Sequence, residues 1–284
     1  ITHDGKYLVS SSYDKTIKIW DIKTGECLNT FEGHNDRVSS VTITRDGKYI
    51  ISGSYDYTIK IWDIKTGECL NTLKKSYSSG VNSVAIAHYG KYIISASKDS
   101  LIKIWNIKTG KYLNTFKGHN DSVTSVTITP DSKYIVSGSY DNTIKIWDIK
   151  TGKCINTLKG HSRHVEIVKL TSNGKKIVSG SDDNTIMIWD IKTGECLSIL
   201  NVHADDTSSI SITTDDKYIV LGSYDTIFRI LDIKTGKCLN TFEGHNGSVT
   251  SVTITADGKY IVSGSLDNTI KIWDIKTGKC LNTF

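Results

Sequence analysis

The sequence predicts an all-β fold built from seven similar units, each of them a sheet of four antiparallel strands. Tryptophan recurs every 42 or 43 residues, with Leu231 in the one vacant place, at Trp20, Trp62, Trp105, Trp147, Trp189 and Trp273. Each unit holds four short runs rich in Val, Ile, Thr and Tyr, and Gly, Asp and Asn separate these runs as they do in turns. A helical period of apolar residues is missing throughout, so helices are not expected.

The second unit illustrates the strands in chain order. We expect them at residues 38–44, 49–54, 58–64 and 69–73. Alternation along the third of these strands places Ile59 and Ile61 on one face of the sheet and Trp62 on the other. A sheet that is apolar on both faces must be covered on both faces. Stacking of neighbouring units around a ring satisfies this requirement.

Composition is that of an ordinary soluble chain: 284 residues, 38% hydrophobic, 23% charged and a net charge of +5. No apolar run approaches the roughly 20 residues that a membrane helix needs, so no membrane partner is expected. Cysteine occurs once in six of the units, at Cys27, Cys69, Cys154, Cys196, Cys238 and Cys280. Without a Cys-x-x-Cys pair these residues predict neither a metal site nor a redox motif. We expect small hydrophobic side chains on outer strands of a reduced, cytoplasmic protein, with no cofactor.

The sequence around each tryptophan is also repeated. It runs Tyr-Ile-x-Ser-x-Ser, Tyr-Asp-x-Thr-Ile-Lys-Ile-Trp-Asp, Ile-Lys-Thr-Gly and Gly-His at fixed phase. Over its whole length the chain resembles the WD-repeat (tryptophan–aspartate repeat) β-propeller family. The resemblance implies a seven-bladed β-propeller of four-stranded antiparallel blades, one domain of residues 1–284, and protein binding rather than catalysis.

The first residue of the chain does not coincide with the start of a repeat. Residues 1–5 align with residues 43–47, so the first blade is incomplete and lacks its inner strand. We expect a segment outside residues 1–284 to supply that strand. One interpretation of this offset is that the chain is part of a longer, multidomain protein.

Four blades carry a recurring set of His, Ser, Asp and Trp, which invites a hydrolase interpretation. The sets are His34, Ser52, Asp56 and Trp62; His119, Ser137, Asp141 and Trp147; His161, Ser179, Asp183 and Trp189; and His245, Ser263, Asp267 and Trp273. A catalytic nucleophile is needed once, at a pocket, and not in every blade. A buried indole N–H needs an acceptor, and a buried carboxylate needs donors. We therefore predict a structural hydrogen-bond network and no enzyme; the family resemblance implies that it runs from Trp through Ser and His to Asp.

Two blades depart from the repeat. Blade six replaces Trp by Leu231 and, in the same blade, the first Ser of the Ser-x-Ser run by Leu221. The paired loss predicts that this first serine is the partner of the tryptophan, because an orphan hydroxyl is costly. His203 and Asp225 remain and could still pair. In blade three, residues 75–77 stand where Gly-His is expected.

A partner is expected on the upper rim, defined as the ends of the sheets where the first strand begins and the second strand ends. The candidates are Tyr13, Arg37, Tyr55, Lys98, Tyr140, Arg163, His164, Glu166 and Tyr224. Tyrosine and arginine dominate the hot spots of protein interfaces, although tyrosine in a turn can also merely cover its neighbours. Glu166 and Asn82 depart from a row of small hydroxyl residues that we expect along the central channel. The leading hypothesis is a non-catalytic scaffold, docking or sensor domain in signalling, with a protein or peptide ligand.

The opposite, lower rim is rich in lysine. The hairpins between the first and second strands and the Ile-Lys-Thr-Gly turns each contribute one lysine per blade. Binding of an anion or a nucleic acid through this rim is the alternative hypothesis. Nearby Asp and Glu residues and the absence of a nucleic-acid module make nucleic acid the less favoured partner. We interpret these lysines mainly as solubilising residues.

Overall fold

The computed structural model describes residues 1–74, 78–87, 90–202, 207–255 and 257–284. Within these residues the fold is all-β, with 27 strands and no helix. The chain is a seven-bladed β-propeller of antiparallel blades, as the sequence predicted. None of the described residues forms a helix long and apolar enough to cross a membrane. The chain divides into two compact units, residues 1–141 with 145–157 and residues 142–144 with 158–284.

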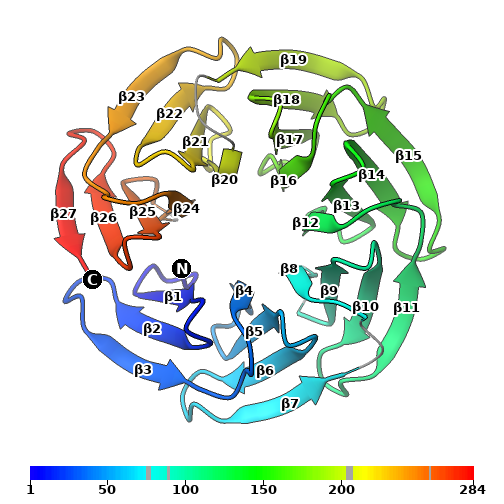
Figure 1. The fold of residues 1–284 in the computed structure, drawn as a ribbon, viewed down its shortest axis with the longest axis horizontal. Coiled ribbons are helices and arrows are strands. Elements are labelled where there is room, and N and C mark those ends of the chain that lie inside the picture. Colours follow the sequence, from blue (N-terminus) through cyan, green and yellow to red (C-terminus); the bar gives the residue numbers. More distant parts are fainter. Residues whose placement is uncertain (75–77, 88–89, 203–206, 256) are drawn as a thin grey trace. The chain divides into compact units, whose positions relative to one another are not determined.

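The first unit holds the first four blades, and β14 and β15 belong to it between Lys145 and Thr157. Its strands are β1 (Tyr7–Ser11), β2 (Ile17–Asp21), β3 (Cys27–Phe31), β4 (Val38–Ile43), β5 (Tyr49–Ser54), β6 (Ile59–Asp63), β7 (Cys69–Leu73), β8 (Val81–Ile86), β9 (Tyr92–Ser97), β10 (Ile102–Asn106), β11 (Tyr112–Phe116), β12 (Val123–Ile128), β13 (Tyr134–Ser139), β14 (Thr143–Asp148) and β15 (Cys154–Lys159). The first blade has the three strands β1 to β3 and the others have four. Each four-stranded blade of this unit contributes its first strand to a row in which β8 lies between β4 and β12 (Figure 1).

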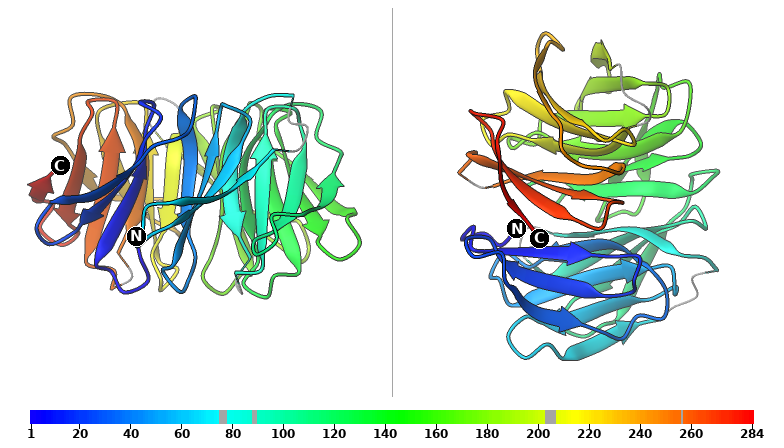
Figure 2. Two further views of the ribbon diagram at one scale, coloured as in Figure 1. Left: turned by 90° about the horizontal axis from the view of Figure 1, so that it is seen from below. Right: turned by 60° about the vertical axis from the view of Figure 1, so that its left-hand side comes forward.

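The second unit holds the last three blades. Its strands are β16 (Val165–Leu170), β17 (Lys176–Ser181), β18 (Thr185–Asp190), β19 (Cys196–Asn201), β20 (Thr207–Ile212), β21 (Tyr218–Ser223), β22 (Phe228–Asp232), β23 (Cys238–Phe242), β24 (Val249–Ile254), β25 (Tyr260–Ser265), β26 (Ile270–Asp274) and β27 (Cys280–Thr283). Strand β20 lies between β16 and β24. Figure 2 shows the strands of each blade side by side, from two further directions.

A β-bulge interrupts the pairing of the first and second strands in the four-stranded blades. In blade two, Val38 pairs with Ser54 and Ser40 with Gly53, so Ser39 is the extra residue. Blade five repeats the arrangement with Glu166 as the extra residue of β16. A bulge bends its strand and re-aims the side chain of the inserted residue. The bulge therefore gives one side chain per blade a direction that plain strand alternation would not.

The hydrophobic core lies between neighbouring blades, as the two-sided apolar pattern requires. Ile51 of β5 packs in one cluster with Val81 of β8 and Trp105 of β10. Glycine in the second strand permits this approach: a Cβ at Gly53 would lie 2.7 Å from Val81 Cγ1. Burial of such side chains contributes roughly 1.5–3 kcal/mol each. The blades are thus stabilised mainly by contact with their neighbours.

Candidate functional site

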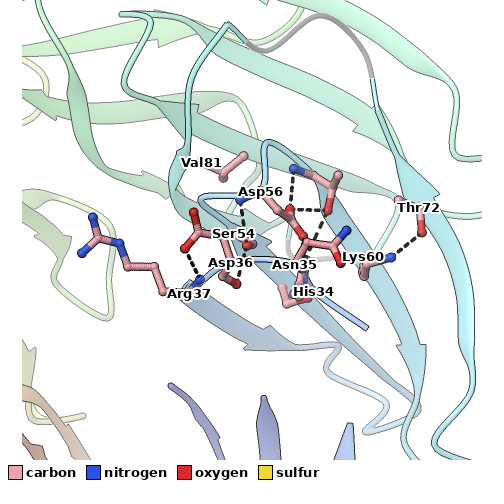
Figure 3. A network of polar contacts seen from close by, with 12 residues as sticks. His34, Asn35, Asp36, Arg37, Ser54, Asp56, Lys60, Thr72 and Val81 are labelled. Atoms are coloured by element: carbon pink, nitrogen blue, oxygen red, sulfur yellow. Dashed lines mark hydrogen bonds and ion pairs between the residues drawn. The ribbon is translucent and has the colours of Figure 1, made fainter. Parts of the chain in front are cut away.

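The recurring Trp, Ser, His and Asp of blade two form one hydrogen-bond chain. Trp62 Nε1 donates to Ser52 Oγ at 2.8 Å, and Ser52 Oγ lies 2.7 Å from His34 Nε2. His34 Nδ1 lies 2.8 Å from Asp56 Oδ2. Because an ionised carboxylate can only accept, Nδ1 carries the proton and Nε2 accepts the Ser52 hydroxyl. Figure 3 shows Asp56 beside His34 and Asn35, whose backbone N–H donates to the same carboxylate oxygen at 2.9 Å.

Three further blades repeat this chain almost without change. The His Nδ1 to Asp Oδ2 distances are 2.8, 2.9 and 2.8 Å at His119–Asp141, His161–Asp183 and His245–Asp267. The His Nε2 to Ser Oγ distance is 2.7 Å at Ser137, Ser179 and Ser263. The indoles of Trp147, Trp189 and Trp273 donate to these serines at 2.8 to 2.9 Å. The serine next to the tryptophan is therefore the first of each Ser-x-Ser run.

Burial sets the electrostatics of the chain. Ser52, Ser137, Ser179 and Ser263 are 0% exposed, so a substrate has no access to their hydroxyls in this conformation. Burial lowers the pKa of His161, and the neighbouring Asp183 carboxylate offsets this only in part. Burial acts to raise the pKa of Asp56, but hydrogen bonds from His34, Thr58 and Asn35 outweigh it and hold that pKa well below its usual range. A neutral imidazole between a serine hydroxyl and a carboxylate ties together the strands and loop that carry them.

Blades three and six hold the equivalent aspartate with a cation from the third strand. In blade three, Lys103 Nζ lies 3.8 Å from Asp99 Oδ2. In blade six, Arg229 Nη1 donates to Asp225 Oδ2 at 2.9 Å. The sequence had suggested His203 as the partner of Asp225, but His203 lies outside the described residues, as do residues 75–77 of blade three. The sequence did not predict these two ion pairs. The place of Lys103 and Arg229 holds a lysine in most blades, including blades in which histidine already holds the aspartate.

The upper rim of the first unit carries a continuous row of cations and tyrosines. The Arg37 guanidinium lies 5.2 Å from the ring centre of Tyr13 and 4.0 Å from that of Tyr55. Lys98 Nζ lies 4.4 Å from the Tyr55 ring centre. We call these four residues the Tyr13–Lys98 row. Figure 3 shows the Arg37 side chain extending away from the buried His34–Asp56 pair. Tyr140, the fifth candidate of this unit, is 38% exposed in the turn after β13.

In the second unit, three of the predicted residues lie close to Asp182, a residue that was not predicted. These three are Arg163, His164 and Glu166. Arg163, His164 and Glu166 come from the start of β16 and the loop before it, and Tyr224 is exposed in the turn after β21. Arg163 Nη1 lies 3.5 Å from the backbone oxygen of Asp182. Asp182 Oδ2 lies 3.4 Å from His164 Nδ1. Asp182 stands where most blades have tyrosine, a substitution that was visible in the sequence but not assigned to a site.

The row of bulge residues makes contacts between neighbouring blades. Ser39 Oγ donates to the backbone oxygens of Gly53 and of Val81 in the next blade. Asn82 Nδ2 donates to Ser122 Oγ and to the backbone oxygen of Val123, both at 2.9 Å. Asn82, which departs from the row of small hydroxyl residues, therefore makes its hydrogen bonds within the fold.

The lysines of the lower rim lie beside carboxylates. Lys133, Lys217 and Lys259 pair with the aspartates two residues before them at 3.4, 3.3 and 3.8 Å. Exposed pairs of this kind contribute about 0–1 kcal/mol to stability, but they reduce the positive field of the rim. The six cysteines are free and exposed on the outermost strands.

Comparison with known proteins gives two findings. A family model described as "WD domain, G-beta repeat" (WD40) matches seven segments, residues 1–21, 25–63, 67–106, 110–148, 152–190, 194–232 and 236–274. The Lissencephaly-1 homolog of Heterostelium pallidum is 54% identical over 35 residues, which cover 12% of this chain and 8% of that protein.

Proposed function

The chain belongs to the WD domain, G-beta repeat family, and on that premise we propose that it is a non-catalytic scaffold that binds an acidic peptide segment of a partner protein along the Tyr13–Lys98 row. Propellers of this family are generally protein-interaction scaffolds, which supports the general role. The ligand class is inferred from the chemistry of the row.

The observation that carries the proposal is the stacking of two cations on the exposed ring of Tyr13 and the half-buried ring of Tyr55. Tyr13 is 65% exposed, and Arg37 lies between the rings of Tyr13 and Tyr55. No described carboxylate lies within ion-pairing distance of Arg37 or Lys98. Stacking restricts the rotamers of the cations before a ligand arrives, so less side-chain entropy is lost on binding. An Asp or Glu side chain of a peptide can accept from Arg37 while apolar atoms lie on the tyrosine rings.

Backbone hydrogen bonds hold the row in place. Tyr55 N donates to Arg37 O, and Lys98 N donates to Gly80 O, both at 3.0 Å. Each bond joins the turn after a second strand to the residue that precedes a first strand. The row is therefore mounted on strand ends, which position a binding site more firmly than free loops do.

The proposal is tested by selecting peptides from a displayed random library on the protein and measuring their affinity by fluorescence anisotropy. Substitutions taken from the chain's own repeat keep the fold, so Arg37→Ser follows Ser122 and Tyr55→Leu follows Leu266. We expect peptides rich in Asp and Glu, and at least tenfold weaker binding to each variant. Lys133→Ala and Lys217→Ala on the lower rim are matched controls, and they should bind as the wild type does. Selected peptides that bind all four variants equally would contradict the proposal, as would binding lost only in the lower-rim variants.

A further inference from the structure

The second unit has a group of side chains that the peptide-binding proposal does not use. One nitrogen of His164 and one carboxylate oxygen each of Glu166 and Asp182 lie within 4.8 Å of one another. We propose that these three residues bind a divalent transition-metal ion, with Zn²⁺ as the preferred ion. The sequence predicted no metal site. The chain has no Cys-x-x-Cys pair, and the three ligands proposed here do not form a sequence motif.

The fold fixes the positions of all three residues. The backbone N–H of Asp182 donates to the backbone oxygen of His164 at 3.1 Å, so their side chains leave adjacent points of the rim. Glu166 is the bulge residue of β16, and the bulge re-aims its side chain. His164 Nδ1 and Asp182 Oδ2 are already 3.4 Å apart. Zinc ligands at about 2.0–2.2 Å in a tetrahedron are separated by about 3.3–3.6 Å, so only the wider spacings must close by an ångström or so.

The internal repeat supplies an independent argument. The place of His164 holds Arg37, Gly80, Ser122, Asp206 and Ser248 in other blades, and the place of Asp182 holds Tyr13, Tyr55, Lys98, Tyr140, Tyr224 and Leu266. The place of Glu166 holds Ser39, Asn82, Thr124, Ser208 and Thr250. Blade six also has a carboxylate at the first of these places, Asp206, but only blade five has a metal-ligating type of side chain at all three places at once. The three replacements meet at one point in space, which scattered surface substitutions would not do.

The donor set favours zinc over the hard cations. Calcium takes six to eight oxygen ligands, and magnesium keeps an octahedral shell of oxygens and water. Zinc accepts both imidazole nitrogen and carboxylate oxygen, and it occurs with three protein ligands and one open position, so one histidine with two carboxylates can hold it. A pocket of about 340 Å³, lined by Asn142, Ser162, Arg163, His164 and Asp182, borders two of the three proposed ligands. Side chains 47% exposed at His164 and 23% exposed at Asp182 are accessible to an ion from solution.

The test measures Zn²⁺ binding by isothermal titration calorimetry on the full chain with its six exposed cysteines alkylated, because free thiols also bind zinc. The variants His164→Ser, Glu166→Thr and Asp182→Tyr each install a residue that other blades carry at that place. We expect one Zn²⁺ per alkylated chain and at least tenfold weaker binding in each variant. Circular dichroism melting of the variants checks that the fold is retained. Equal Zn²⁺ affinity in the wild type and all three variants would overturn the proposal, and so would the absence of binding to the folded wild type.

Blade seven allows the converse experiment. Leu266 N donates to Ser248 O at 2.9 Å, which reproduces the backbone pairing of Asp182 and His164. We expect the triple variant Ser248→His, Thr250→Glu and Leu266→Asp to bind a second Zn²⁺ per chain. With Co²⁺ as the probe, the near-ultraviolet spectrum should show no thiolate-to-cobalt charge-transfer band at either site. A transplanted site that leaves the stoichiometry at one would contradict the claim that these three positions suffice.

Discussion

Lys103 Nζ lies 3.8 Å from Asp99 Oδ2, and the two side chains are only 5% and 8% exposed. Blade three has no histidine where blades two, four, five and seven have Gly-His, so Lys103 supplies the charge that faces its aspartate. In blade two the equivalent Lys60 instead donates to Thr72 Oγ1 at 2.9 Å, because His34 already holds Asp56. One repeated lysine thus has two different roles, depending on whether histidine is present.

The first prediction follows from this difference. Lys103→Met should lower the free energy of unfolding by about 3 kcal/mol, because it leaves the buried Asp99 without its cation. The matched variant Lys60→Met should change it by less than about 0.5 kcal/mol, since blade five already has Met187 at this place beside an intact His161–Asp183 pair. Urea denaturation followed by tryptophan fluorescence measures both. Equal losses in the two variants would show that Asp99 does not depend on Lys103.

The sequence predicted the repeat, its strands and the hydrogen-bonded sets, because these rest on local patterns present in several copies. The expected strand at residues 58–64 differs from β6 (Ile59–Asp63) by one residue at each end. Lys103 has the same identity as Lys60, and the missing histidine of blade three does not by itself show which side chain faces Asp99, so the pairing of Lys103 with Asp99 was not predicted. The contact of Asp182 with His164 depends on which turn lies beside which strand start, and the sequence alone does not give that distance.

Trp62 and Ser52 provide the second prediction. Ser52→Ala removes the acceptor of the Trp62 N–H and the hydroxyl that faces His34 Nε2, and we expect it to cost about 1–3 kcal/mol. In a double-mutant cycle with Trp62→Phe, the combined cost should be smaller than the sum of the single costs. The physical reason is that the second change then removes a group that is already unpaired. Blade six carries Leu221 and Leu231 at these two places and shows that both can be lost together. Strictly additive costs would refute the coupling.

Acidity should destabilise the fold in two successive windows. Burial places the pKa of His161 and of His245 below the ordinary value of 6.5, so the unfolded chain takes up protons first as the pH falls. Stability is therefore lost as the pH falls below about 6.5. Asp56 and Asp267 have pKa values far below 3.8 in the folded state, so their contribution is complete above about pH 4 and is lost only at lower pH.

The third prediction isolates the upper window. The double variant His161→Gln and His245→Gln should have a lower urea midpoint at pH 7.5, because both hydrogen-bond chains lose a member. Its midpoint should nevertheless fall less between pH 7.5 and pH 5 than that of the wild type. The slope against pH, and not the absolute stability, is the quantity to compare. An unchanged slope would mean that these two histidines do not control the upper window.

The fourth prediction compares two glycines at the same place in the repeat. A Cβ at Gly53 would lie 2.7 Å from Val81 Cγ1 and 3.0 Å from Val84 Cγ1, whereas a Cβ at Gly264 meets no described atom within 4 Å. Gly53→Ala should therefore cost about 1–3 kcal/mol by overpacking the space between β5 and β8. Gly264→Ala should be neutral or stabilise by up to about 1 kcal/mol, because alanine reduces the conformational entropy of the unfolded chain. Both residues have an extended backbone that alanine adopts without strain, so the difference between the two urea midpoints reports packing alone. Similar midpoints for the two variants would mean that the tight approach of β8 to Gly53 relaxes at little cost.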